Sequence, residues 1–322
     1  MTWSLLVLCA AASAVIAFAF SAVLGAGVAM FRRRLVGLTA AAEARVLFGI
    51  TLLPMLACGA VMTAAFAPSF GWIVDHCTQA GDPHAHPHIC IAHHVSALPA
   101  VTLVGLAAML LVRVLAAVVQ FVRGTIAALL TRRALLRMSE VGEDGVRVLP
   151  FDEPQAFVVG ALSPVMFVTR GLLSDVHREH LAPVLSHERS HLRRRDPLRR
   201  LAASIALGFH LPGLAAWLER RLARAHEIAA DADAAAELRS PERVARALVR
   251  LTRAQKRTPA MAAAFAESDV EIRVATLLDQ RARQDRPGKA ALIAAVALLF
   301  VVVGASADGV HHGVEIILGF LS

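Results

Sequence analysis

Long stretches without a charged residue constrain this chain more than any other feature. Hydrophobic residues make up 57% of its 322 positions, which is well above the share usual in globular domains. Four apolar runs stand out: Met1 to Phe31, Val46 to Val74, Val95 to Val112 and Ala290 to Ala307. Each approaches or exceeds the ~18 to 20 apolar residues needed to cross a bilayer. The sequence therefore predicts a mainly α membrane protein with four transmembrane helices.

Basic residues indicate how these helices are oriented. Arginines follow the first and third runs, whereas the loop from Asp75 to His94 contains neither Lys nor Arg. By the positive-inside rule, the N-terminus and this loop lie outside in a multi-pass protein of the inner (cytoplasmic) membrane. The expected parts are residues 1–122 with three helices and outer loop 75–94, a cytoplasmic α+β domain at 123–289, and the fourth helix with a short outer tail at 290–322.

The cytoplasmic segment contains the motif HERSH, in which His187 and His191 are four residues apart. Histidines at this spacing share one face of a helix and can bind a single zinc ion. Glu188 would then lie beside the open coordination position of a catalytic zinc site, where a base is needed. Five-residue patterns of this kind also arise by chance in Arg- and His-rich helices, so a third ligand is required.

A second motif, RAHEIAADADAA, supplies that ligand. It places Glu227 and Asp231 four residues apart in an Ala-rich helical stretch, so both carboxylates face the same way. Glu227 would complete a two-histidine, one-glutamate site that holds one zinc per chain. Asp231, one turn further, is placed to accept the free ring N–H of a ligating histidine. The alternative is a solvated acidic stripe on a surface helix, which we would favour only if HERSH were absent.

Short β-branched and aromatic runs between Val146 and Thr169 predict a small antiparallel sheet before the catalytic helix. An edge strand near Phe157 to Gly160 could pair with an extended substrate, although a sheet that only packs on the helix is equally compatible. The uncharged run Leu201 to Leu218 is interrupted by Gly and Pro, which predicts a hairpin packed on the spans or dipping into the inner leaflet. Residues 241–286 are expected to be helical scaffold.

These motifs resemble the BlaR/MecR-type integral-membrane zinc metallopeptidases in four segments: PQAFVVGALSPVMFVTRGLL, LSHERSHLRRRD, GFHLPGLAAWLERRLARAHEIAADADA and EIRVATLLD. That family carries a gluzincin-like domain between its third and fourth spans, facing the cytoplasm. The resemblance implies that His187, His191 and Glu227 are the zinc ligands and that Glu188 is the base. Asp231 matches the acidic residue that ends the family's second motif.

The chain is also similar to the CAAX-prenyl-protease and HtpX-type membrane peptidases, which share the patterns AF..G, HExxH and ExxAD. An arginine three residues before the third ligand is common in those proteins, and Arg224 occupies that place here. The similarity implies that Arg224 could polarise the substrate carbonyl. An arginine near a carboxylate pair is as often a structural ion-pair partner.

The predicted function is that of a membrane-anchored zinc endopeptidase that cleaves cytoplasmic or membrane-proximal proteins. The family resemblance implies a transcriptional repressor, or the chain itself, as the substrate in a signalling or stress response. Antirepressor receptors of the BlaR/MecR type carry a large sensor after the fourth span, and only about fifteen residues follow it here, so a β-lactam sensor is not expected. The alternative is a proteolytically silent receptor or metal-sensing scaffold.

Outer loop 75–94 is the candidate signal-sensing region of such a scaffold, because histidines and cysteines are concentrated in it. The candidates for a metal site or a disulfide are Cys77, Cys90, His84, His86 and His88. A flexible polar loop with no metal is the competing interpretation. The net charge of +8 does not indicate nucleic-acid binding, because arginines on the inner face meet the lipid bilayer and no aromatic platform or groove-reading helix accompanies them. The sequence leaves the oligomeric state open.

Overall fold

The structure is a computed structural model that describes residues 3–30, 37–66, 101–142, 145–174, 178–255 and 263–279. Most of these residues are helical. The described helices that precede the site are α1 (Trp3–Met30), α3 (Ala40–Ala65) and α4 (Val101–Met138), followed after the sheet by α5 (Arg170–Leu173). The helices that carry or surround the site are α6 (Arg178–Arg194), α7 (Asp196–Ala206), η4 (Leu207–Phe209), α8 (Pro212–Leu238), α9 (Pro241–Gln255) and α10 (Ala263–Leu278).

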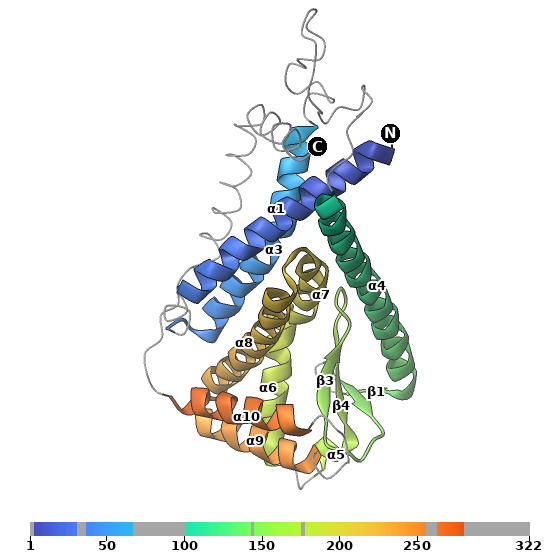
Figure 1. Cartoon of the computed structure of the whole chain (residues 1–322). Coiled ribbons are helices and arrows are strands. Elements are labelled where there is room, and N and C mark those ends of the chain that lie inside the picture. Colours follow the sequence, from blue (N-terminus) through green and yellow to red (C-terminus); the bar gives the residue numbers. More distant parts are fainter. Residues whose placement is uncertain are drawn as a thin grey trace, which may run out of the picture.

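Three of the described helices are long and apolar enough to cross a membrane. The candidate spans are Cys9–Met30, Ala40–Ala64 and Val104–Met138. Helix α1 packs along α3, and α4 meets α1 at one end and diverges from it toward the sheet (Figure 1). The first three predicted spans thus correspond to helices. The fourth predicted span and the outer loop 75–94, with its Cys and His candidates, lie outside the described residues.

The second and third helices differ in extent from the apolar runs that predicted them. Helix α3 begins six residues before the run at Val46, where the Thr39 side chain caps it by accepting the Ala42 N–H at 3.2 Å. Helix α4 continues from Val112 to Met138 without interruption. The part of α4 after Val112 contains no proline and is rich in Ala, Leu and Arg, which favour a helical conformation. The third helix therefore reaches well past the apolar run, down to the sheet.

A four-stranded sheet follows α4, in the order β1-β2-β4-β3. The strands are β1 (Glu140–Val141), β2 (Arg147–Leu149), β3 (Ala156–Val159) and β4 (Val165–Thr169). The sheet is mixed, so the prediction of a purely antiparallel sheet was wrong. Strands β3 and β4 form an antiparallel hairpin that places β4 beside β2. Strands β2 and β4 run parallel to each other. Strand β3 lies at the edge of the described sheet, as the sequence predicted.

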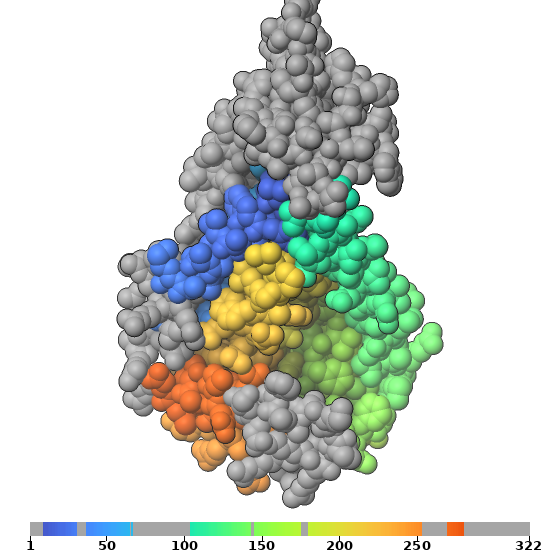
Figure 2. Space-filling view, viewed as in Figure 1, coloured from blue at the N-terminus to red at the C-terminus, as the bar shows by residue number. Residues whose placement is uncertain are grey.

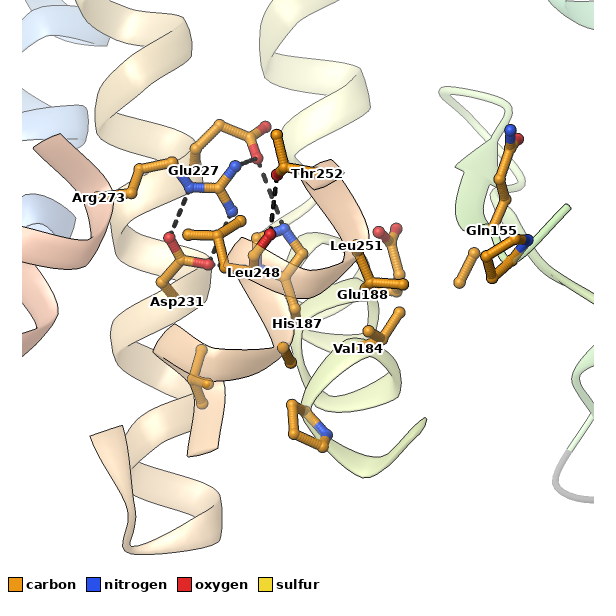
Figure 3. Close-up of a pocket in the computed structure, with 15 residues that line it drawn as sticks. Gln155, Val184, His187, Glu188, Glu227, Asp231, Leu248, Leu251, Thr252 and Arg273 are labelled. Carbon is orange, nitrogen blue, oxygen red and sulfur yellow. Dashed lines mark hydrogen bonds and ion pairs between the residues drawn. The ribbon is translucent and has the colours of Figure 1, made fainter. Parts of the chain in front are cut away.

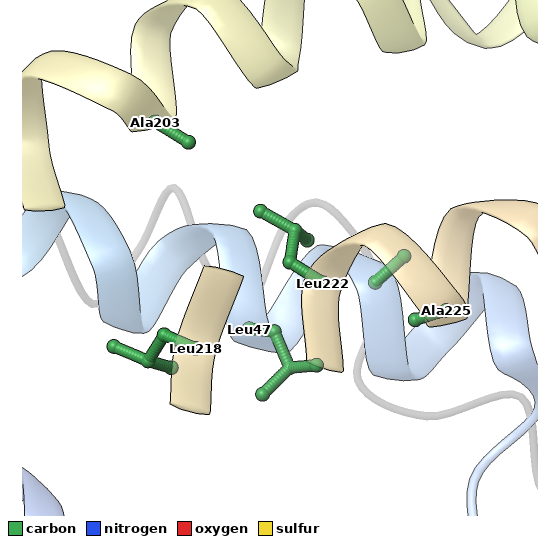
Figure 4. Packing of buried hydrophobic residues seen from close by; sticks show 6 residues of the cluster. Leu47, Ala203, Leu218, Leu222 and Ala225 are labelled. Atoms are coloured by element: carbon green, nitrogen blue, oxygen red, sulfur yellow. The ribbon is translucent and has the colours of Figure 1, made fainter. Parts of the chain in front are cut away.

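Helices α7 and α8 form a hairpin that docks among the spans. The uncharged run from Leu201 to Leu218 breaks at η4, as predicted, and the chain reverses there (Figure 1). Figure 2 shows the surface of α8 lying between those of α1 and α4. Leu218, Leu222 and Ala225 of α8 pack on Leu47 of α3 (Figure 4). This apolar contact joins the helix that carries Glu227 to the second span.

Polar contacts fix the tip of the hairpin to all three described spans. The fully buried His210 ring contacts the Ser21 Oγ at 3.3 Å through Nδ1 and the Thr51 carbonyl oxygen at 3.1 Å through Nε2. Arg113 donates to the carbonyl oxygen of Leu207 at 3.1 Å. Gly208 lets α4 approach closely, because a Cβ there would lie 3.2 Å from the Cβ of Ala117. The hairpin is thereby attached to α1, α3 and α4.

Candidate metal centre

Donor atoms from two packed helices converge at one point. His187 and His191 of α6 bring their Nε2 atoms to 3.1 Å of each other. The Glu227 carboxylate of α8 lies 3.5 Å from the Nε2 of His187 and 3.7 Å from that of His191. Tetrahedral zinc, with bonds of about 2.0–2.2 Å to N and O donors, spaces its ligand atoms roughly 3.3 Å apart. The three predicted ligand residues are therefore arranged as a zinc site requires.

Two further carboxylates hold the histidine rings in place. Asp231 Oδ1 accepts from His187 Nδ1 at 2.8 Å, and Asp196 Oδ2 accepts from His191 Nδ1 at 2.8 Å. Each contact fixes the proton on Nδ1 and leaves Nε2 free for a metal. Both aspartates are almost fully buried, at 1% exposure. The site thus has one orienting carboxylate for each histidine.

Asp196 was not predicted from the sequence. It stands in the basic run RRRDPLRR, which we interpreted as lipid-facing arginines. Arg195 adopts a left-handed conformation with φ 54°, so the chain turns sharply between α6 and α7. This turn directs Asp196 back toward His191. A lone carboxylate among arginines, close to a ligand motif, was the signal that the sequence offered.

Arg273 of α10 contacts two carboxylates of α8, those of Asp231 and Glu227. Its Nε and Nη2 atoms donate to the two oxygens of Asp231 at 2.7 and 2.8 Å, and its Nη1 lies 3.4 Å from Glu227 (Figure 3). Arg200 donates to the other oxygen of Glu227 at 2.8 Å. The expected scaffold at residues 241–286 is helical where the structure describes it, but it also contributes side chains to the site. Helix α10 supplies an arginine that orients the carboxylates, and α9 lines the cavity described below.

Arg224, the predicted stabiliser of the reacting carbonyl, lies elsewhere. Its guanidinium pairs with Asp269 at 2.7 Å, and it is not among the residues that line the cavity. In the described part of the chain, the arginines that contact the ligand set are Arg200 and Arg273. The arrangement of Arg224 matches the structural ion-pair alternative that the sequence left open.

Two of the three donors, His187 and Glu227, open onto a cavity of ≈ 230 Å³. Glu188 lines this cavity together with His187 and Glu227. Figure 3 shows the Glu188 side chain pointing into the gap between α6 and the segment that precedes β3, with Gln155 on the opposite side. A group bound in this gap would lie next to both the ligand set and the predicted base.

Burial and charge set the protonation of these groups. Burial raises the pKa of Glu188, although His187 and His191 oppose the shift. Burial alone would lower the pKa of His187, but Asp231 and Glu227 outweigh it and raise this pKa to about 9. Burial alone would raise the pKa of Glu227, but His187 and Arg273 hold it below its usual range. Glu227 therefore stays ionised, while a metal must displace a proton from His187.

Comparison with known proteins finds a family likeness for part of this arrangement. Residues 130–216 match the model of Peptidase family M48, and this segment contains His187, Glu188 and His191 but ends before Glu227. The chain is related to the M48 peptidases. The match covers α6 and α7, so the M48 segment includes the motif helix and the buried Asp196.

Curated relatives of this M48 segment are homologues of protease HtpX. The Salinibacter ruber protein is 29% identical over 158 residues, which is 40% of this chain and 55% of the relative. The Aquifex aeolicus protein is 36% identical over 89 residues, 26% of this chain and 29% of the relative. The chain thus spans about half the length of these relatives, or less. The likeness to HtpX-type peptidases is confirmed, and the BlaR/MecR-type likeness stays a prediction. No solved structure matches the chain.

The contact between Asp196 and His191 predicts that Asp196 tunes metal affinity. Asp196→Asn should weaken zinc binding by roughly 10- to 100-fold, because the substitution removes the carboxylate charge that orients the His191 ring. Competition with a chromophoric chelator measures this affinity in the purified chain. Asp233→Asn is the matched control, since Asp233 contacts Ser190 and Arg194 rather than a ligand. Equal affinities for the two variants would show that Asp196 does not act on the metal.

Proposed function

We propose that the chain is a membrane-anchored zinc metallopeptidase that hydrolyses peptide bonds in cytoplasmic or membrane-proximal proteins. One observation carries this proposal: His187, His191 and Glu227 converge on one point beside Glu188, and the cavity lined by His187, Glu188 and Glu227 is open to the edge strand β3. The M48 match and the HtpX homologues support it, because their names describe proteases. The three apolar helices support membrane anchoring.

The donor set of two imidazoles and a carboxylate fits zinc. A zinc ion held by these residues supplies a Lewis acid that activates water and polarises a peptide carbonyl. Glu188 is placed to take a proton from the attacking water and to deliver it to the departing amine. Its raised pKa suits a group that must hold this proton briefly. Asp231, Asp196 and Arg273 keep the ligands oriented throughout, and no covalent intermediate is expected.

The edge strand β3 can position the substrate. The Gln155 carbonyl accepts from Thr169 N–H at 3.0 Å, so the backbone of Gln155 faces β4. Backbone groups alternate along a strand, and those of Ala156 and Val158 therefore face the free edge of the described sheet. An extended peptide that pairs with this edge would pass Glu188 on the opposite wall of the cavity. Such pairing recognises backbone rather than one particular sequence.

The remaining predictions extend this proposal. Arginine placement supports an outside N-terminus and a cytoplasmic catalytic side in the inner membrane. We expect a protein substrate, and a transcriptional repressor or the chain itself in a signalling or stress response remains the hypothesis from resemblance. A silent receptor is less compatible with Glu188, because a structural zinc site closes its fourth position with a protein ligand and needs no base.

Profiling of new protein N-termini in cells tests the function. Cells that carry the wild-type chain should contain N-termini that are missing from cells carrying Glu188→Ala, and these termini would name the substrate. Glu219→Ala, an exposed glutamate on α8, is the matched control and should give the wild-type profile. If wild type and Glu188→Ala give the same profile under metal, antibiotic and envelope stress, the receptor or scaffold alternative is favoured.

A further inference from the structure

Helix α4 is longer than a bilayer requires. Its candidate span, Val104–Met138, has 35 residues and extends about 52 Å at 1.5 Å per residue. The hydrocarbon core of a bilayer is only ~30 Å thick, so even a tilted α4 leaves part of its length outside the core. The exposed side chains of α4 indicate where the lipid ends.

An exposed apolar stripe runs down α4 past the uncharged run that ends at Val112. Its members recur three or four residues apart, so they share one face of the helix. They are Leu115, Val118, Val122, Ile126, Leu129 and Leu130, at 39% to 59% exposure. Arg123 is the only charged residue from Val114 to Thr131, and its long side chain can extend toward a headgroup. Arg132 and Arg133 end the stripe. An apolar surface of this extent is typical of contact with lipid or with a partner.

The turn between β3 and β4 carries another exposed apolar side chain. Leu162, at 84% exposure, is the most exposed large hydrophobic residue in the described part of the chain. The turn lies against α4, because a Cβ at Gly160 would be 3.5 Å from the side chain of Arg132. Gly160 has a φ of 106°, and the same Cβ would be 2.9 Å from the carbonyl oxygen of Ser163, so the turn is tight. Figure 1 shows the hairpin pointing from the sheet toward the spans.

We propose that this turn and the lower end of the stripe form a docking surface for the inner leaflet of the bilayer. Leu129, Leu130 and Leu162 enter the leaflet, where burial removes their apolar surface from water. Arg132 and Arg133 lie at the headgroups, because the anionic lipids of the cytoplasmic leaflet attract them. The stripe is continuous with the membrane-crossing part of α4, which favours a bilayer over a second protein as the occupant.

This docking would act on the position of the site. Strand β3 begins at the cavity wall, beside Gln155, and ends at the turn that carries Leu162. A turn held in the leaflet would therefore keep β3 and the cavity at a fixed distance from the bilayer. The inference concerns lipid contact and does not require that the chain hydrolyses peptides.

Fluorescence quenching in lipid nanodiscs that contain an anionic phospholipid tests the surface with the full chain. The four cysteines are replaced with alanine, and Leu162→Cys or Leu130→Cys carries a nitrobenzoxadiazole label. Both labels should emit at shorter wavelength and be quenched by lipids with a spin label in the upper acyl chain. Leu173→Cys is the matched control, since α5 lies at the end of the sheet away from the spans (Figure 1), and it should stay unquenched. Met138→Cys, about 12 Å further along α4 than Leu130, should also stay unquenched.

A photo-crosslinking amino acid at position 162 repeats the test with all four cysteines intact, in case their replacement disturbs the fold. It should form adducts with phospholipid. Quenching that is absent at both Leu162 and Leu130, or equally strong at Leu173, overturns the docking surface. Crosslinks at position 162 to a second copy of the chain, without lipid adducts, overturn it as well and assign the surface to self-association.

Discussion

Replacing His187 or Glu227 with alanine should remove zinc from the purified chain and abolish peptide hydrolysis. Each substitution leaves two of the three donors that converge in the structure. The zinc content, measured by elemental analysis after dialysis against a zinc buffer, should fall from about one zinc per chain to nearly none. Glu219→Ala, on the exposed surface of α8, should keep the wild-type content.

The expected loss of zinc in Glu227→Ala has a second cause besides the missing ligand atom. Glu227 is the carboxylate that faces both Arg200, at 2.8 Å, and Arg273, at 3.4 Å. Without it, two guanidinium groups would border the place where a cation must bind. Glu227→Ala should therefore lose zinc at least as completely as His187→Ala. Full zinc content in both variants would rule out this ligand set.

Glu188→Gln should separate chemistry from metal binding. The amide keeps nearly the same shape, and Glu188 is not among the three converging donors, so zinc content should stay at the wild-type value. Hydrolysis should fall by about 10²- to 10⁴-fold, which is the typical contribution of a positioned acid–base group. Initial rates on a cleaved peptide, normalised to zinc content, measure this loss. A rate within a few-fold of wild type would assign the base to another group.

The ligands could be predicted from the sequence because their geometry is local. His187 and His191 lie one helical turn apart, and so do Glu227 and Asp231, so spacing alone places each pair on one helix face. That the two helices pack with these faces together was inferred from chemistry rather than from any pattern. The distances between their donor atoms agree with that inference.

Asp196 and Arg273 could not be predicted in the same way, because their roles depend on tertiary contacts. Asp196 reaches His191 only because Arg195 adopts a left-handed conformation. Arg273 is 42 residues from Asp231 along the chain, and its contact requires α10 to pack on α8. The apolar periodicity of α9 predicted a helix but did not say what its apolar face covers. That face packs on α6 and α8 and also lines the cavity.

Sequence patterns also predicted elements better than their pairing or extent. The β-branched runs located the strands, but the order of the strands depends on the β3–β4 hairpin, which no alternation pattern encodes. Apolar runs located three spans, yet the third helix extends to Met138 because nothing in the basic segment after Val112 breaks a helix. The first arginine after Val112 marks the end of the predicted membrane-crossing part, but helix α4 itself continues to Met138.

The zinc K-edge X-ray absorption spectrum of the purified full chain tests the central claim most directly. The account predicts zinc bound to N and O donors at about 2.0–2.2 Å, with scattering from two imidazole rings and no sulfur near about 2.3 Å. The imidazole scattering should disappear together with the metal in His191→Ala. A sulfur shell, or zinc that remains bound with an unchanged spectrum in His191→Ala, would contradict the claim that His187, His191 and Glu227 hold the metal.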